Sequence, residues 1–329
     1  MSKLKKYFIL SVDTEPDDST WSELGHGPWP SENLKGLGKF ADRMRGLNIL
    51  PTYLVSHSIA ESALFENIIK QDLANNACEI GAHFHPADTP PFSKGKSTDN
   101  ILKVETNLLE EKFSTLHSLL VSRFGPITSY RSGAWAIDSR VTALLKRFNY
   151  LVDSSVTPGI SWRYNGRPSY LEAPRSAYPL GDGNPSMAGQ KSQKNLWEIP
   201  VSIFSSYSLA GSLLGNLLGD FLTMPLASRK SIPANIIRIL RPQAPKWLRP
   251  AFKKMPQLES VAMDLEKSGA NYLHVMCHSS ELWPGTSPFC KTETDVAELH
   301  SRLDGICRFA LGRGYIPITL SNYAKILET

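Results

Sequence analysis

The chain has 329 residues, and its 36 Lys and Arg against 31 Asp and Glu leave a formal charge of +5. An apolar fraction of 41% and a charged fraction of 20% argue against long disorder, and no repeated period indicates a solenoid. The mild positive charge does not indicate a nucleic-acid-binding protein, which would show a clustered basic face. Four cysteines without a C-x-x-C pair are typical of a reducing compartment.

Short apolar runs predict the β-strands. The first run is too short for a signal peptide and stops at Asp13, so we expect a buried first strand in a cytoplasmic protein. The predicted strands are residues 7–12, 49–55, 79–85, 128–132, 150–153, 196–203, 272–277 and 315–319.

Longer amphipathic segments between these runs predict helices. Asp138 is positioned to cap one of them, and Thr292 with Asp295 resembles a capping box at the start of another. The predicted helices are residues 101–124, 138–149 and 292–312. Alternating strands and helices predict parallel strands with crossover helices, as in a (β/α) barrel or an open doubly wound sheet. The dinucleotide-binding form of that sheet is disfavoured because no G-x-G-x-x-G follows the first strand.

One long stretch, residues 205–256, interrupts the alternation, and we interpret it as a helical and basic insertion within a single catalytic domain spanning 1–329. Its first part, 209–226, is rich in Leu and Gly but holds polar residues and is a poor membrane span. Basic residues and a Trp follow. The insertion is either a lid packed on the barrel or, through 209–254, a peripheral contact with an anionic inner membrane face, and the two can coexist.

Polar residues gather where the predicted strands end. The carboxyl ends of parallel strands in a barrel converge on one rim, where active sites lie. In chain order, the polar residues nearest these ends include Asp13, His83, Arg131, Asp153 and His278. Five polar strand ends from distant parts of the sequence therefore predict one site.

Two histidines of this set have metal-ligand spacing. Side chains alternate along a strand, so His83 and His85 point the same way and can reach one ion. Two histidines with one carboxylate form a common metal site that leaves positions open for water and substrate. The alternative for a histidine pair alone is a surface or core role.

The acidic strand end supplies the carboxylates. Four of them follow the first strand within six residues, and like charges repel unless a cation neutralises them. A metal hydrolase needs one carboxylate on the metal and a second to accept a proton from water, which fits Asp13 and Glu15. The alternative is a solvated loop or a helix cap.

Beyond the strand at 272–277, His278 could act as a general acid or hold a loop, whereas His274 is expected to pack in the core.

These motifs resemble the polysaccharide deacetylase (NodB-homology) family, carbohydrate esterase family 4. In the family's order, SVDTEPD, EIGAHFHP, YRSGAW, VDSS and MCHSSE are similar to its five motifs. HSSELWPGTSP and AHFHPADTPP most resemble the WalW-like branch found in lipopolysaccharide and surface-polysaccharide gene clusters. The resemblance implies a distorted (β/α) barrel of about seven parallel strands.

The resemblance also implies roles for individual residues. Asp13 would be the catalytic base and His278 the general acid. Arg131 would orient Asp13, and Asp153 would hold His278. The metal ligands would be Glu15, His83 and His85, with Asp17 competing for the place of Glu15, and the divalent metal would be zinc.

Three features depart from the family pattern. One residue separates Asp13 from Glu15, where the family has adjacent acids, and the histidines are two apart instead of four. The third motif lacks the usual prolines, which puts its contribution to an oxyanion site in question. Trp135 in that motif is either a wall of the acetyl pocket or a core residue.

The implied reaction is hydrolysis of an N-acetyl group on an amino sugar of a glycan or a lipid-linked sugar. The alternatives are a deformylase or another C–N hydrolase on a lipid-linked sugar, and a non-catalytic metal-dependent glycan-binding protein. A metal-dependent glycosyltransferase would use Asp13 and Glu15 but leaves His278 without a role.

Overall fold

The computed structural model describes residues 5–17, 29–92, 98–192, 195–205, 219–220, 223 and 244–329. Its central sheet is nine-stranded, in the order β10-β1-β2-β3-β4-β5-β7-β6, with β11 beside β1. The pairs from β10 through β7 are parallel, as is β1 with β11, while β6 is antiparallel to β7. The strands are β1 (Lys6–Thr14), β2 (Pro51–Val55), β3 (Glu79–Phe84), β4 (Ser129–Ser132), β5 (Val152–Asp153), β6 (Tyr178–Pro179), β7 (Trp197–Glu198), β10 (Tyr272–His278) and β11 (Tyr315–Pro317).

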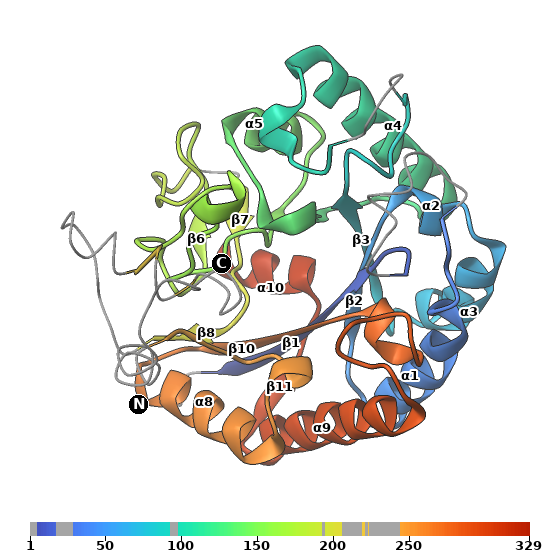
Figure 1. Cartoon of the computed structure of the whole chain (residues 1–329). Helices are drawn as coiled ribbons and strands as arrows, with labels where there is room; N and C mark the ends of the chain where they lie inside the picture. The colour runs from blue at the N-terminus through green and yellow to red at the C-terminus, as the bar shows by residue number, and fades with distance from the viewer. Residues whose placement is uncertain are drawn as a thin grey trace, which may run out of the picture.

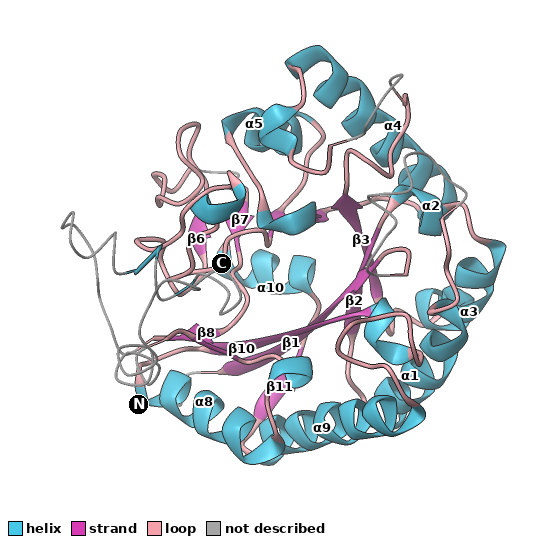
Figure 2. Cartoon of the chain, viewed as in Figure 1, coloured by secondary structure: helices cyan, strands magenta, loops and turns pink. Residues whose placement is uncertain are grey.

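The sheet curls into a half-barrel with helices around its outer side (Figure 1). Coloured by secondary structure, the strands line the inside and α3, α1, α9 and α8 follow the outer rim (Figure 2). The predicted distorted (β/α) barrel is confirmed. The helices are α1 (Leu34–Gly46), α2 (His57–Ala60), α3 (Ala63–Ala74), α4 (Thr106–Phe124), α5 (Ser139–Arg147), α8 (Met255–Lys267), α9 (Glu293–Gly312) and α10 (Leu320–Leu327).

The predicted helix caps are present. The Asp138 carboxylate accepts from two backbone N–H groups of α5, and Thr292 and Asp295 form the capping box of α9. The helix predicted from residue 101 begins as α4 at Thr106, because a separate 3₁₀ turn occupies Ile101–Lys103. Local capping chemistry therefore sets these boundaries.

Alternation along β1 separates the two faces of the sheet. Phe8, Leu10 and Val12 belong to the main core, whereas Tyr7 and Ile9 belong to a second apolar cluster that includes residues of α10. Continuing that alternation, Ser11 and Asp13 follow Tyr7 and Ile9 on the inner face of the half-barrel. The inside is therefore apolar where α10 packs and becomes polar toward the carboxyl ends of the strands.

The strand predicted over 196–203 is wrong in part, because it divides into two elements. Pro200, which has no N–H to donate to a ladder, follows β7, and the chain then forms β8 (Ile203–Phe204). β8 pairs antiparallel with β9 (Lys246–Trp247) in a separate two-stranded sheet. The residues just before the predicted insertion are thus paired with residues in its last part.

Most of residues 209–226, with Arg238 and Arg241, lie outside the described residues. Within the described part of the chain, no helix is both long and apolar enough to cross a bilayer. Arg249, a basic residue within the 209–254 segment of the predicted membrane contact, is 6% exposed. Its side chain therefore does not take part in a membrane-facing surface.

Candidate active site

Strand register brings the predicted residues together. Asp13 on β1 is paired with His278 on β10, and His83 on β3 is paired with Arg131 on β4. Parallel strands hold their carboxyl ends at one edge, so polar residues at those ends become neighbours. The sheet thus juxtaposes residues that are 265 positions apart in the chain (278 − 13).

Glu15, His83 and His85 form a buried cluster with metal-ligand geometry. Glu15 Oε2 lies 3.1 Å from His83 Nε2 and 2.7 Å from His85 Nε2, and the two nitrogens are 3.0 Å apart. Bond lengths of about 2.0–2.2 Å let one zinc ion reach all three atoms at such separations. The chain therefore has a buried group able to hold a metal, as the histidine spacing predicts.

The outer nitrogen of each histidine is already occupied. His83 Nδ1 lies 3.1 Å from the Arg131 carbonyl oxygen, which can only accept, so Nδ1 carries a proton and, in the neutral ring, Nε2 has the lone pair. His85 Nδ1 lies 2.7 Å from Asp99 Oδ1. A carboxylate behind a histidine is the usual support of a metal ligand, because it fixes the ring and raises its basicity. The donor set thus fits a divalent ion.

Electrostatics link these groups. Burial opposes ionisation of Glu15, but His85 and His83 outweigh it and hold the pKa of Glu15 well below its usual range. Burial likewise opposes the charged form of His85, yet Asp99 and Glu15 raise its pKa well above the ordinary value. These two carboxylates therefore favour the charged form of His85 in the metal-free protein. A metal would replace its Nε2 proton.

Asp17, the competing ligand, has a different task. Its two carboxylate oxygens accept from the backbone N–H groups of Asn33, at 3.0 Å, and Glu32, at 3.1 Å. These bonds anchor the chain just before α1. Among the described residues, the metal-ligand group contains Glu15 and excludes Asp17.

Asp13 is buried beside the cluster and paired with Arg131. Arg131 Nη1 donates to Asp13 Oδ1 at 2.5 Å, and both side chains are almost fully buried. Burial raises the pKa of Asp13, but Arg131, with His83 and His278, more than offsets it and lowers the pKa overall. Asp13 is therefore ionised at neutral pH, and Arg131 is its ion-pair partner.

Arg131 is itself fixed by a polar network inside the half-barrel. Its Nη2 donates to Ser11 Oγ and Ser154 Oγ, both at 2.9 Å, and Ser11 contacts His274 Nε2 at 2.8 Å. His274 Nδ1 lies 3.2 Å from the Pro200 carbonyl oxygen. Burial and the Arg131 charge lower the pKa of His274 to about 3. His274 is a core residue, as predicted, but also a neutral member of this network.

His278 has partners that sequence analysis missed. Its Nε2 lies 3.7 Å from Asp13 Oδ2 and 3.6 Å from Glu15 Oε1. On its other side, Nδ1 lies 2.8 Å from Arg249 Nη2 and 3.5 Å from Glu281 Oε1. The ring therefore stands between the acidic strand end and an Arg–Glu pair.

The expected contact between Asp153 and His278 is absent from the described structure, which corrects that prediction. β5 and β10 are not neighbours in the sheet, and Asp153 instead accepts from Ser155 and stands in register with Glu198 on β7. Both acids are fully buried. Burial raises the pKa of Asp153, and burial with the Asp153 charge raises that of Glu198 well above its usual range. Asp153 belongs to a buried carboxyl pair behind Arg131.

The turn after β4 is strained and close to His85. Ala134 and Trp135 have φ values of 54° and 59°, which non-glycine residues rarely adopt. A Cβ on Gly133 would lie 2.5 Å from His85 Nδ1. Trp135 is 9% exposed, and its ring lies 5.1 Å from the Arg131 guanidinium and 5.6 Å from the ring of Trp247. Trp135 is therefore buried against the network that holds Asp13.

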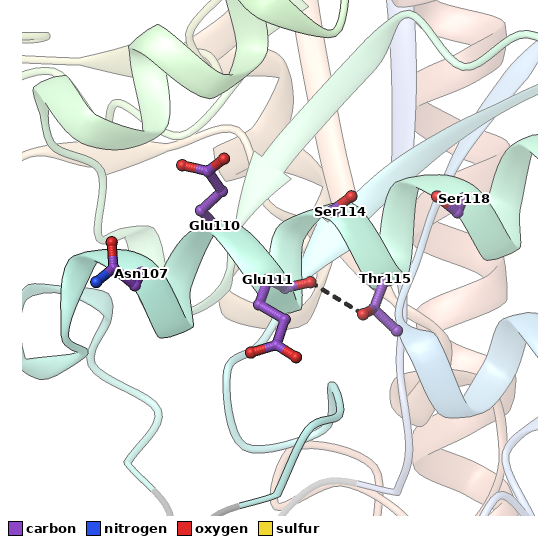
Figure 3. A pocket seen from close by; sticks show the side chains of 6 residues that line it. All are labelled: Asn107, Glu110, Glu111, Ser114, Thr115 and Ser118. Carbon is purple, nitrogen blue, oxygen red and sulfur yellow. Dashed lines mark hydrogen bonds between the residues drawn. The ribbon is translucent and has the colours of Figure 1, made fainter.

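A hollow of about 660 Å³ lies elsewhere, along α4 (Figure 3). The described residues that line it all come from that one helix, and Thr115 Oγ1 donates to the Glu111 carbonyl oxygen at 2.9 Å within it. A hollow without groups converging from several elements has no arrangement suited to catalysis. The converging side chains are those at the strand ends.

No family model matches the sequence, and no curated protein matches it. Solved structures do match the fold. One is assigned as a polysaccharide deacetylase from Mycobacterium smegmatis, with a TM-score of 0.52 and 15% identity over 98% of this chain and 90% of that chain. Another, from Parabacteroides distasonis, is assigned as a glycoside hydrolase/deacetylase, with a TM-score of 0.54 and 9% identity over 98% of this chain and 72% of that chain.

A third match is a 4-alpha-glucanotransferase from Thermococcus litoralis, with a TM-score of 0.52 and 12% identity over 98% of this chain and 40% of that chain. At these identities the likeness shows the fold, which this chain shares with polysaccharide deacetylases. Because a glucanotransferase has a similar fold, the reaction must be inferred from the side chains of the site.

Proposed function

We propose that this protein is a metal-dependent hydrolase that removes the N-acetyl group from an amino sugar, with zinc as its metal. The observation that carries the proposal is the placement of Asp13. Its carboxylate is fixed by Arg131 beside the Glu15, His83 and His85 group and faces His278 from the other side. One site thus combines a metal-ligand set, a candidate base and a candidate acid.

A zinc ion on Glu15, His83 and His85 would polarise the acetamide carbonyl and acidify water. The residues of the chain supply the proton transfers. Asp13 accepts a proton from water through Oδ2, since Oδ1 is bound to Arg131. The oxygen of that water forms the new bond to the acetyl carbon.

His278 completes the reaction at the leaving group. It donates a proton from Nε2 to the sugar nitrogen as the C–N bond breaks, which yields acetate and a free amine. Burial and Arg249 oppose the charged ring, but Glu281, Glu15 and Asp13 outweigh them and raise the pKa of His278. The protonated form that this step requires is therefore favoured by the surrounding carboxylates.

The proposed substrate is a surface polysaccharide or its lipid-linked precursor, as in lipopolysaccharide biosynthesis. The WalW-like motifs HSSELWPGTSP and AHFHPADTPP support this choice. A cytoplasmic enzyme of this kind would meet its substrate at the inner membrane face. The Leu-rich and basic composition of 209–254 supports a role for that segment as a lid or a peripheral membrane contact.

The test compares wild type with Asp13→Asn on N-acetylglucosamine oligomers and a chromogenic acetamide. Asp13→Asn is expected to keep its metal and to lose about 10²–10⁴-fold in rate, because the amide cannot accept the proton. Asp17→Asn is the matched control: it alters the same acidic strand end without touching the metal-ligand group. Its metal content and rate should stay close to wild type.

Three outcomes would replace the proposal. If Asp13→Asn keeps more than about a tenth of the wild-type rate, Asp13 is not the general base. Cleavage of formamides but not acetamides would indicate a deformylase. Metal-dependent binding of glycans, without release of acetate by wild type, would indicate a binding protein.

A further inference from the structure

Arg249 and Glu281 form a buried ion pair behind His278, outside the residues to which the family resemblance assigns roles. Arg249 is 6% exposed and Glu281 is fully buried. Arg249 Nη2 donates to Glu281 Oε1 at 2.5 Å and to His278 Nδ1 at 2.8 Å. Arg249 and Glu281 lower the cost of burying each other's charge, and both lie close to Nδ1 of the His278 ring.

The chemistry of the guanidinium restricts the histidine. Arginine has only donors, so an Nη2 hydrogen aimed at His278 Nδ1 requires a lone pair on that nitrogen. In the neutral ring the proton is then on Nε2, which faces Asp13 Oδ2 and Glu15 Oε1. When the ring is charged, Glu281 Oε1 at 3.5 Å is the nearby acceptor for the Nδ1 proton.

Contacts on several sides also hold the Arg249 guanidinium in place. Its central carbon lies 4.2 Å from the ring centre of Phe252 and 5.5 Å from that of Phe289. Glu281 Oε2 accepts from the backbone N–H of His278 at 3.3 Å, which ties the carboxylate to the same strand end. Arg249 therefore cannot turn away without losing stacking, an ion pair and a hydrogen bond.

We propose that Arg249, held by Glu281, is a positioning residue that keeps the proton of the neutral His278 ring on Nε2 and aims that atom at the reaction centre. The catalytic consequence rests on the proposed function, whereas the effect on the ring does not. Arg249 follows β9, so the segment returning from residues 206–243 supplies part of the site. The inference gives this end of the predicted insertion a task in catalysis.

The deciding experiment reads the tautomer directly. Nitrogen-15 NMR of the histidine side chains at alkaline pH, where imidazoles are neutral, distinguishes Nδ1–H from Nε2–H. The His278 signals are identified by their loss in His278→Gln. Wild type is expected to show Nε2–H, and Arg249→Met to shift toward Nδ1–H, because Glu281 then becomes the nearest partner of Nδ1.

Two further variants make the result specific. Lys246→Met removes a cation from the same segment and should leave the tautomer unchanged. Arg249→Lys keeps a donor and should fall between wild type and Arg249→Met, and it replaces Arg249→Met if that variant does not fold. Nδ1–H in wild type, or an unchanged tautomer when Arg249 is altered, would overturn the proposal.

Kinetics supply the catalytic readout. With an N-acetylated substrate, Arg249→Met should lower kcat about tenfold or more with little change in KM, because a ring that Arg249 no longer holds points Nε2 at the leaving nitrogen less often, which affects the step after binding. Lys246→Met should change neither. If wild type hydrolyses no acetamide, the proposed function fails, while the tautomer still decides whether Arg249 positions His278.

Discussion

Gly133→Ala should weaken metal binding through a single methyl group. The added Cβ would lie 2.5 Å from His85 Nδ1, 2.6 Å from Cε1 and 2.7 Å from Cγ. Carbon contacts are normally about 3.5–4.0 Å, so the ring must retreat by roughly 1 Å. That shift disturbs the 2.7 Å contact with Asp99 as well as the Nε2 position. We expect zinc affinity to fall at least tenfold, since disturbing the groups that support metal ligands typically costs about 10–100-fold.

The assay is competition with a chromophoric chelator on the purified protein. Gly38→Ala is the matched control, because nothing lies within 4 Å of its added Cβ and alanine favours a helix. Circular dichroism confirms that both variants are folded. A folded Gly133→Ala protein with wild-type zinc affinity would refute the assignment of His85 as a ligand.

Three further predictions concern other parts of the chain. Asp99→Asn should lower zinc affinity about 10–100-fold in equilibrium dialysis, because it weakens the support of His85. His300 should make unfolding pH-dependent: burial lowers its folded pKa to about 4, so below pH 6.5 the unfolded chain binds the extra proton. Stability should therefore fall from pH 6.5 toward 4 by up to about 1.4 kcal/mol per pH unit, and less so in His300→Leu, in urea titrations. Gly36→Ala should lower the unfolding free energy by about 1–3 kcal/mol, since its Cβ would strike the Leu282 carbonyl oxygen.

Each of these has a clear contrary result. Unchanged zinc affinity in Asp99→Asn would mean that the carboxylate does not support His85. Identical pH slopes for wild type and His300→Leu would mean that His300 titrates normally in the folded chain. A fully stable Gly36→Ala protein would mean that α1 and the 3₁₀ turn Ser279–Leu282 separate easily.

Sequence patterns were sufficient for the parts of the site that lie on strands. Alternation places His83, on β3, and His85, the residue after β3 ends, on one side, and parallel strand ends converge, so the metal-ligand group follows from local rules. Asp13 and His278 meet for the same reason. Sequence patterns could not decide whether Glu15 or Asp17 is the metal ligand. Only the fold shows that the Asp17 carboxylate is bound to backbone N–H groups before α1.

The supporting residues required the fold. Asp99 lies fourteen residues beyond His85, and Arg249 lies 29 residues before His278, and neither spacing follows a strand or helix periodicity. For Asp153, the motif match predicted a contact with His278. The order of strands in the sheet does not allow that contact. Glu281 had a local signal: it follows His278 by three residues, where a carboxylate can reach back to the backbone N–H.

The pairing of β8 with β9 has a consequence for changes in the length of the chain between them. It holds Phe204 and Lys246 side by side, so the chain positions that flank residues 205–245 are adjacent. Lengthening a loop whose ends are already joined costs little, about 0.6 kcal/mol for each doubling. Changes in the length of 206–243 should therefore cost the barrel little stability. Arg249 follows β9, so such changes would leave it beside His278.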